Sequence, residues 1–142
     1  MLEDKIGVRP ALPADVEWLD VFYESLMKPY VELTHSWDTS IFRKCYDPDV
    51  SSIIQYDGED IGFLVVKERA DGLYLGDIQL KREYQGKGIG SYFIKQILSS
   101  ENRQGREVRL RVLKGNPAIK LYLRFGFKVD QELDNCYQML FV

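Results

Sequence analysis

Residues 79–98, QLKREYQGKGIGSYFIKQIL, change from strand-like to helix-like character, and this change restricts the fold more than any other feature. Apolar residues repeat at helical spacing after the change, whereas the segment before it reads as the end of a strand. A helix N-terminus presents unpaired N–H groups and the positive end of the helix dipole. Glycines at such a start permit positive φ and close approach of an anion, and they are Gly86, Gly88 and Gly90. The stretch therefore predicts an anion-binding loop with Lys87 adding charge, the alternative being a tight turn without a ligand.

Two common phosphate loops do not match this spacing. A nucleotide P-loop requires G-x-x-x-x-G-K-[ST], but here Lys87 is followed by Gly88. A dinucleotide loop requires G-x-G-x-x-G, but the final position is Ser91 when counted from Gly86. The loop is thus expected to bind its anion in another way.

Length and composition favour one folded domain over residues 1–142. The longest apolar runs are too short for a membrane span and the N-terminus lacks a secretion signal, so we expect a cytoplasmic protein without a membrane partner. A net charge of −3 disfavours nucleic-acid binding. Cys45 and Cys136 form no metal-ligand cluster, so we expect buried thiols and no metal.

Apolar spacing, together with the glycine and proline residues that mark turns, predicts an α+β order of elements. A strand at residues 4–11 precedes a helix at 13–27, which Pro29 should end, and a short helix near 39–46. An antiparallel meander follows, with Asp-Gly turns, and then the glycine loop, a helix, a strand, a short helix and two closing strands. The expected ranges of these later elements are 51–56, 61–68, 72–80, 89–98, 106–113, 116–125, 127–130 and 136–142.

The loop fits the pattern Q-x-x-G-x-G, with Gln85, Gly88 and Gly90, and it resembles the GNAT superfamily of N-acetyltransferases. A second landmark of that family follows in RLRVLKGNPAIKLYLRFGF, a strand, an asparagine at a helix start and a tyrosine before Gly-Phe. The resemblance implies a mixed, mainly antiparallel twisted sheet of about seven strands with about four helices. It also implies that strands 72–80 and 106–113 splay apart.

The resemblance implies acetyl-CoA as the donor, with its pyrophosphate on the loop amides and its pantetheine arm along the end of strand 72–80. A backbone N–H near Leu80 would meet the acetyl carbonyl. The residues that the resemblance assigns to the donor are Leu80, Lys81, Gln85, Gly86, Lys87, Gly88, Ile89, Gly90, Ser91 and Asn116.

Acetyl transfer requires a proton donor for the departing thiol and a route for the proton of the amine. Tyr122 stands where the family places its general acid, and its pKa of about 10 keeps it protonated at neutral pH. The alternative for Tyr122 is packing on the apolar face of its helix, and for Asn116 it is capping that helix. Asp77 is the candidate base, although Gly76 stands where many relatives carry glutamate.

The loop MKPYVELTHSWD resembles a stretch recurrent in one bacterial-type group of the family, written K-P-Y-V-E and W-x-W-D. His35 stands where many of those proteins carry the first tryptophan, and it is also a second candidate base. Aromatic and acidic side chains suit an amine, and an arginine on strand 106–113 suits an anionic group of the acceptor. The expected acceptor-binding residues are Tyr30, Glu32, His35, Trp37 and Arg111, with packing or solvation as the alternatives.

The sequence thus predicts direct acetyl transfer from acetyl-CoA to a primary amine of a small molecule or amino-acid derivative. Two alternatives stay open, acetylation of a protein N-terminus or lysine and a non-catalytic acyl-CoA-binding module. Many relatives dimerise, so a homodimer is a further expectation.

Overall fold

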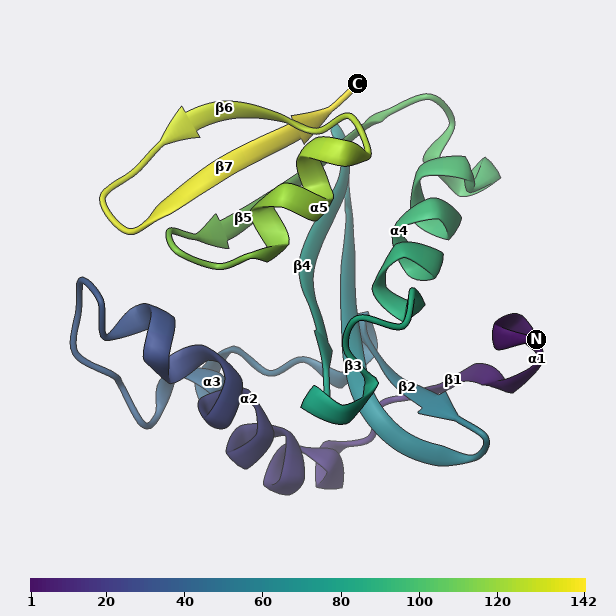
Figure 1. The fold of residues 1–142 in the computed structure, drawn as a ribbon, viewed down its shortest axis with the longest axis vertical. Helices are drawn as coiled ribbons and strands as arrows, with labels where there is room; N and C mark the ends of the chain where they lie inside the picture. Colours follow the sequence, from purple (N-terminus) through teal and green to yellow (C-terminus); the bar gives the residue numbers. More distant parts are fainter.

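The computed structural model describes residues 1–142, except for the side chain of Asn102, and it contains a strongly twisted sheet of seven strands (Figure 1). The strands in their order across the sheet are β1 (Ile6–Pro10), β2 (Ser51–Tyr56), β3 (Glu59–Arg69), β4 (Gly72–Leu80), β5 (Glu107–Leu113), β7 (Cys136–Phe141) and β6 (Lys128–Glu132). The α-helices are α1 (Leu2–Lys5), α2 (Val16–Val31), α3 (Ile41–Cys45), α4 (Ile89–Ser99) and α5 (Ala118–Arg124). The predicted mixed α+β fold is confirmed.

One pair of neighbouring strands is parallel, and it separates along its length. β4 pairs with β5 only from Gly72 to Leu75, whereas β5 stays paired with β7 from Val108 to Leu113. The half of β4 from Gly76 to Leu80 therefore has no strand on its β5 side (Figure 1). The predicted splay is confirmed, and it opens a gap in the middle of the sheet.

Helices cover both faces of the sheet. On one face α2 and α3 pack on Ile53 and Phe63, and on the other α4 packs on Ile54 and Ile61. The stripe predicted for the first long helix supplies the first of these cores, through Leu19, Phe22 and Leu26. No described helix combines the length and the apolar character that a membrane crossing needs.

The prediction that Pro29 ends the helix is wrong, because α2 continues to Val31. A proline inside a helix removes the hydrogen bond to the carbonyl four residues earlier, here that of Ser25. Arg82 Nη2 donates to the Ser25 oxygen over 2.9 Å and so replaces the missing N–H. This bond also ties α2 to the segment that leads into the glycine loop.

Three smaller expectations also need correction. The segment before the first strand forms α1, whose Leu2 packs against the core beneath α4. The strand itself is shorter than predicted and begins at Ile6. Of the two cysteines, both free thiols, Cys136 is buried as expected but Cys45 is exposed.

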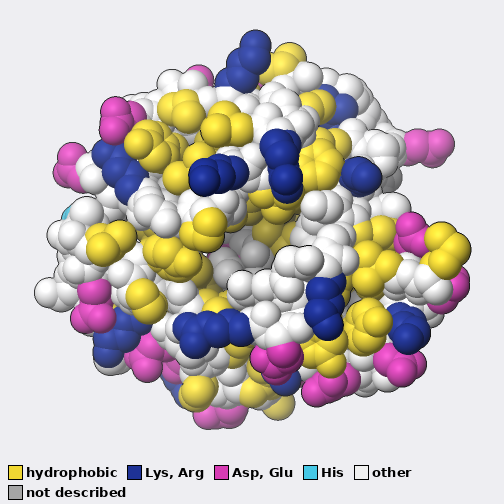
Figure 2. Space-filling view, viewed as in Figure 1, with side chains coloured by type: hydrophobic (Ala, Val, Ile, Leu, Met, Phe, Trp, Pro, Cys, Tyr) yellow, Lys and Arg dark blue, Asp and Glu magenta, His cyan; other side chains and the backbone are white. Residues whose placement is uncertain are grey.

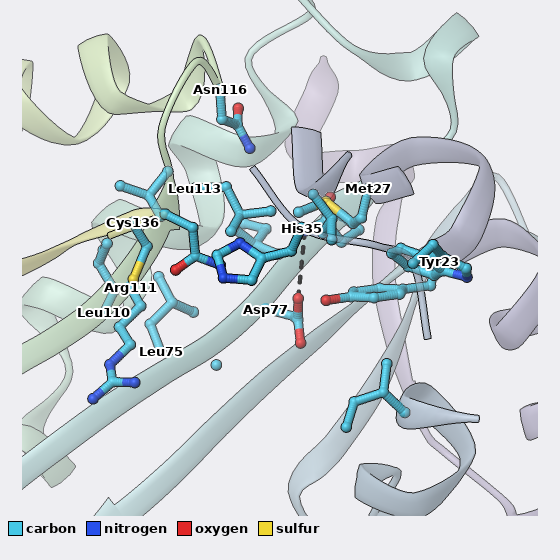
Figure 3. Close-up of a pocket in the computed structure, with 18 of the residues that line it drawn as sticks. Tyr23, Met27, His35, Leu75, Asp77, Leu110, Arg111, Leu113, Asn116 and Cys136 are labelled. Carbon is cyan, nitrogen blue, oxygen red and sulfur yellow. Dashed lines mark hydrogen bonds between the residues drawn. The ribbon is translucent and has the colours of Figure 1, made fainter. Parts of the chain in front are cut away.

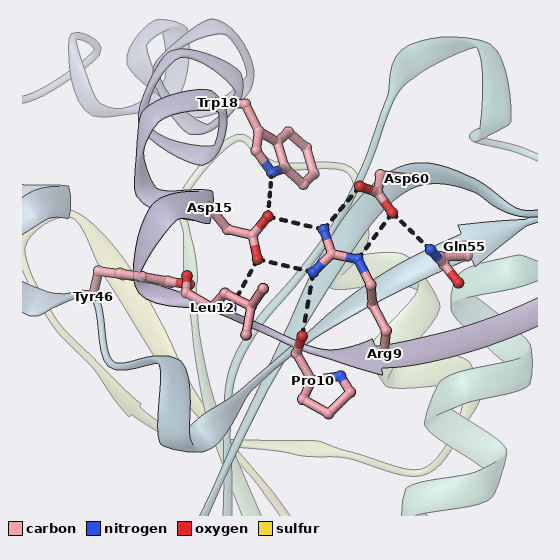
Figure 4. Close-up of polar contacts among 8 residues, drawn as sticks. All are labelled: Arg9, Pro10, Leu12, Asp15, Trp18, Tyr46, Gln55 and Asp60. Carbon is pink, nitrogen blue, oxygen red and sulfur yellow. Dashed lines mark hydrogen bonds and ion pairs between the residues drawn. The ribbon is translucent and has the colours of Figure 1, made fainter.

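A charged cluster joins β1, β3 and the start of α2 (Figure 4). The Arg9 guanidinium donates to Asp15 over 2.8 and 2.9 Å and to Asp60 over 2.8 and 3.2 Å. Asp15 also accepts from the Leu12 N–H and from the Trp18 indole. These bonds to Arg9 lower the pKa of both carboxyls, so the cluster is fully ionised at neutral pH.

Candidate active site

The backbone of β4 is available to a ligand inside the splay. The Lys81 N–H donates to the Ile61 oxygen over 2.8 Å, next to the pair formed by Leu80 and Gly62. This pattern makes Leu80 and Gly62 a non-hydrogen-bonded pair, so the N–H and C=O of Leu80 point away from β3. The same alternation turns the N–H and C=O of Ile78 into the gap.

The backbone contacts differ in one respect from the sequence-based expectation. Both backbone groups of Lys81 are used within the chain, since its oxygen accepts from the Tyr84 N–H over 2.9 Å. Gln85 Nε2 donates to the Leu80 oxygen over 2.9 Å and holds the glycine loop against the strand. Ile78, which sequence reasoning missed, therefore joins Leu80 as a backbone donor facing the gap.

The glycine loop ends at the N-terminus of α4. Gly86 and Gly88 have φ of +73° and +86°, and Gly88 is the residue that precedes the first helical turn. Gly90 does not have the expected positive φ, because it already lies within α4, where an added Cβ would stand 3.9 Å from Leu121 of α5. A side chain at this position would therefore make only an ordinary contact, whereas the positive φ of the other two glycines shapes the loop.

The remaining loop residues divide between core and surface. Ile89 is 1% exposed and anchors the loop in the core, which leaves only its backbone for a ligand. Lys87 is exposed and lies over the Tyr84 ring, with 5.8 Å from Nζ to the ring centroid, and Ser91 is half-buried. Figure 2 shows the surface hollowed near the middle of this face, with Lys and Arg side chains around the hollow.

A cavity of about 490 Å³ lies where β4 and β5 separate (Figure 3). It brings together Asp77, Tyr122 and Asn116 with three of the residues expected at the acceptor, His35, Trp37 and Arg111. It does not include Tyr30, which packs in the core beneath α2, or Glu32, which is exposed. Tyr23 and Tyr74 line the cavity as well and were not anticipated.

A β-bulge directs Asp77 into this cavity. Val65 of β3 pairs with Asp77 and Val66 pairs with Leu75, so Gly76 is the extra residue. Regular alternation would place Asp77 on the face of Leu75, which packs in the core beneath α4 and α5. The bulge instead places Asp77 on the same face as Tyr74, toward α2. Glycine suits the bulge, because a Cβ on Gly76 would stand 2.9 Å from Val65 Cγ1.

The surroundings of Asp77 adjust its acidity. Enclosure by protein raises the pKa of its carboxyl to about 7, against opposing effects of a hydrogen bond from Gln79 and the charge of Lys67. Gln79 Nε2 lies 3.4 Å from Asp77 Oδ1. A carboxyl with a pKa near neutrality accepts and releases protons at physiological pH, which a general base must do.

Tyr122 packs in the core, as one interpretation of its position predicted, and it also lines the cavity. The residue is 8% exposed, and its ring meets that of Phe127 edge-on with 5.7 Å between centroids. Burial raises the pKa of its hydroxyl, and the negative charge of Asp77 raises it further. The hydroxyl therefore keeps its proton at neutral pH, and Tyr122 lines the same cavity as Asp77.

Asn116 caps α5, as its sequence context predicted. Its Oδ1 accepts from the Ala118 N–H over 2.9 Å. The amide nitrogen is left to point toward the cavity (Figure 3). His35 is exposed, with 2.8 Å between its Nδ1 and Thr34 Oγ1. Within the described residues no group of three His, Cys, Asp or Glu side chains is arranged as a metal site.

Comparison with protein families decides the assignment. The model of the acetyltransferase (GNAT) domain matches residues 47–129, more than half of the chain. The chain belongs to the GNAT acetyltransferase family. The matched range of this GNAT domain runs from the start of the meander to β6 and includes β4, the glycine loop and α5.

Curated relatives of this GNAT domain differ in size and name. A probable spermine N(1)-acetyltransferase of Bacillus subtilis subsp. natto is 29% identical over 92 residues, 57% of this chain and 60% of the relative. The human cysteine-rich protein 2-binding protein is 29% identical over 92 residues, 63% of this chain. The match covers only 12% of the human protein's length, so the chain spans a small part of it.

Solved structures share the fold at low identity. The PaiA N-acetyltransferase of Thermoplasma acidophilum, solved with coenzyme A, has a TM-score of 0.75 and 23% identity, covering 95% of this chain and 97% of that one. Arabidopsis thaliana Naa50 with the bisubstrate analogue CoA-Ac-MVNAL has a TM-score of 0.69 and 17% identity, covering 97% and 99%. Both comparisons establish the arrangement of strands and helices.

Proposed function

We propose that this GNAT domain transfers the acetyl group of acetyl-CoA directly to a primary amine of a small molecule or amino-acid derivative. The observation that carries the proposal is the position of Asp77 and Tyr122 on one cavity, at the point where β4 and β5 separate. One side chain can accept a proton there and the other can donate one. Together they supply the two proton transfers that the reaction requires.

Two parts of the structure, the splay and the glycine loop, suit two parts of an acyl-CoA molecule. The pantetheine arm would lie in the splay and pair with the backbone of Ile78 and Leu80 as an added strand would. The pyrophosphate would lie on the amides of residues 85–91, which Gly86 and Gly88 leave open: an added Cβ would meet nothing within 4 Å at Gly86 and only Leu2 at Gly88. Basic side chains around the hollow favour its negative charge (Figure 2).

Acetyl-CoA supplies the thioester, whose C–S bond is exchanged for a C–N bond to the amine. Asp77 takes the proton that the amine nitrogen loses, directly or through a water. Tyr122 donates its proton to the departing sulfur. A backbone N–H of Ile78 or Leu80 stabilises negative charge on the carbonyl oxygen, and no cysteine takes part.

Two other functions of the same site have some support. The relatives named as spermine acetyltransferases suggest a polyamine acceptor, and Naa50 was solved with a peptide-based analogue. A non-catalytic acyl-CoA-binding module would need the loop but not Asp77 and Tyr122 together. We also propose that residues 1–142 act as one domain, because α2, outside the matched family range, lines the cavity through Tyr23 and Met27.

The test is calorimetric titration of the purified protein with acetyl-CoA, followed by a screen of amines for release of free thiol. Gly88→Asp adds a side chain and a negative charge to the loop and should abolish binding. Gly105→Asp is the matched control, because Gly105 also has a positive φ, +71°, and open space for a Cβ but lies beyond α4.

Loss of binding in Gly88→Asp alone, with thiol release by the wild type, would support the enzyme. Binding without turnover of any amine would favour the non-catalytic module. Absence of binding by the wild type would overturn the proposal.

A further inference from the structure

Positively charged side chains flank Asp77 on the face of the sheet that meets α2. Arg111 of β5 lines the 490 Å³ cavity, and Lys67 of β3 lines a second cavity of about 250 Å³ on the other side of Asp77. Tyr74 lines both cavities, as Asp77 does, so the two spaces adjoin along β4. An acceptor with its amine at Asp77 therefore has room to extend on either side.

Strand register explains why these charges gather. Lys67 pairs with Tyr74 across β3 and β4, and Tyr74 pairs with Arg109 across β4 and β5. Arg111 lies two residues beyond Arg109 and therefore on the same face of β5. The Arg69 guanidinium also lies over the Tyr74 ring, with 4.4 Å from Cζ to the centroid. Several positively charged side chains therefore lie close to Tyr74.

Of the acidic groups that line the two cavities, Asp38 and Asp47 are hydrogen-bonded within their own loops and make no ion pair with Arg111 or Lys67 among the described residues. Asp38 Oδ1 accepts from the N–H and the hydroxyl of Ser40, over 2.9 and 2.7 Å. Asp47 accepts from the Asp49 N–H over 2.9 Å and caps a short helical turn. Burial raises the pKa of Asp77 to about 7, which reduces its charge at neutral pH.

The polar groups left without a partner are mostly hydrogen-bond donors. Arg109 is occupied by Glu107 over 2.8 Å, whereas Arg111 and Lys67 make no hydrogen bond or ion pair with the described residues. The indole Nε1 of Trp37, on the wall of the larger cavity, is buried and has no partner among these residues either. Such a lining suits a ligand that brings oxygen acceptors with negative charge.

We propose that the acceptor amine carries an anionic oxygen group, a carboxylate or a phosphate, that binds the Arg111 guanidinium, with Lys67 supplying a second positive charge. This inference rests on the proposed acetyl transfer and narrows its acceptor class. A polyamine would bring two or more positive charges toward Arg111 and Lys67, and like charges in a binding site act against the wrong partner. The chain therefore differs in acceptor from the relatives named as spermine acetyltransferases.

The test compares amines that differ only in the distal group. The probes are the ω-amino carboxylates from 3-aminopropanoate to 6-aminohexanoate, their carboxamides, 2-aminoethyl phosphate and spermidine. The carboxylates of different length show how far the anion lies from the amine. Comparison with 2-aminoethyl phosphate shows whether the site prefers a carboxylate or a phosphate. Each is assayed by thiol release with the wild type, Arg111→Gln and Lys67→Gln.

The wild type should prefer the best carboxylate or phosphate to its neutral analogue by about tenfold in kcat/KM, the size of one charged hydrogen bond. Arg111→Gln should remove this preference by raising KM for the anionic amine much more than KM for the carboxamide. Lys67→Gln should weaken the preference for the anionic amine less than Arg111→Gln does. Arg124→Gln on α5 and Lys95→Gln on α4 are matched controls, because both residues are exposed and outside the cavities.

Equal use of carboxylate and carboxamide, or best use of spermidine, would overturn the inference. If no amine is acetylated, the proposed function fails, and the inference is then judged by thermal shift with the same anionic amines. A rise in melting temperature in the wild type but not in Arg111→Gln would support anion binding. No rise with any of them would refute it.

Discussion

Gly76 faces Val65 across the bulge in β4 so closely that a Cβ would lie 2.9 Å from Val65 Cγ1 and 3.3 Å from its Cβ. The bulge exists because two residues of β4 occupy the space of one opposite β3. It changes which face the next side chain takes, and Asp77 is that side chain. The absence of a side chain at Gly76 therefore permits the bulge, and the bulge sets the position of Asp77.

Gly76→Ala should destabilise the fold by about 1–3 kcal/mol, since the new methyl must displace Val65 or the strand. Because any shift of the strand moves Asp77, kcat for an accepted amine should also fall. Urea unfolding and steady-state kinetics measure both effects. Gly7→Ala is the control, as nothing lies within 4 Å of a Cβ there. Equal effects of the two substitutions would contradict the role of the bulge.

Tyr122→Phe should lower kcat by about 10²-fold, the size of a lost general acid, because only the hydroxyl is removed. The ring contact with Phe127 remains, so stability and acetyl-CoA affinity should stay close to wild type. Rapid-mixing kinetics with an accepted amine and calorimetry give the two values. Tyr56→Phe on β2, outside both cavities, is the control. An unchanged kcat would remove Tyr122 from the mechanism.

The rate should depend on the protonation of Asp77. A base must be unprotonated, so log kcat should rise with pH up to about 7 and level off above it. Asp77→Asn should lose this rise and retain only the dependence that belongs to the ionisation of the amine itself. A pH–rate profile of both proteins, with an amine of low pKa, makes the comparison. The same profile in the two proteins would mean that another group, such as His35, is the base.

Asp77 should also affect stability in the opposite direction from an ordinary carboxyl. Its pKa is about 7 in the folded state and about 3.9 when unfolded, so the folded state binds more protons between these values. The free energy of unfolding should therefore decrease as pH rises from 4 to 8. Asp77→Asn should be more stable than wild type at pH 8 and lose this advantage at pH 4. Asp49→Asn, an exposed carboxyl, should show no such difference in denaturant titrations.

The cluster around Arg9 should govern acid stability. Asp15 and Asp60 have lowered pKa values, so their contribution is complete above the unfolded pKa of about 3.9 and is lost as pH falls toward the folded value. Asp15→Asn should cost about 1–3 kcal/mol at pH 7, with the gap to wild type narrowing below pH 4. Asp4→Asn, an exposed partner of the N-terminus, should cost little. A gap that stays constant down to pH 2 would contradict the ionic role.

The parts that sequence reasoning predicted correctly have local causes. Strands Ser51–Tyr56 and Gly72–Leu80 match the prediction because Asp-Gly turns and apolar runs mark their ends. The Asn116 cap likewise follows from its own side chain. The splay was expected from family resemblance rather than from any local pattern.

The errors come from contacts distant in sequence. The helix continues past Pro29 because Arg82, more than fifty residues away, satisfies Ser25. The bulge at Gly76 depends on Val65 in the neighbouring strand. The residues that surround Asp77, including Tyr23 and Tyr74, could therefore not be predicted from the sequence. Tyr30 and Glu32 were placed by motif alone, and the loop directs other residues to the cavity.

The gap beside β4 is edged by main-chain atoms of Ile78 and Leu80, and every amino acid except proline provides the same pair of groups. A ligand that pairs with these main-chain groups would depend little on the side chains of the strand, which suits a fold recognisable at 17% identity. The cavity in which we propose that the acceptor binds is instead lined by side chains such as Arg111 and Trp37, each of which a single codon can change. Knowledge of the donor should therefore transfer between distant GNAT domains, while the acceptor must be determined for each one.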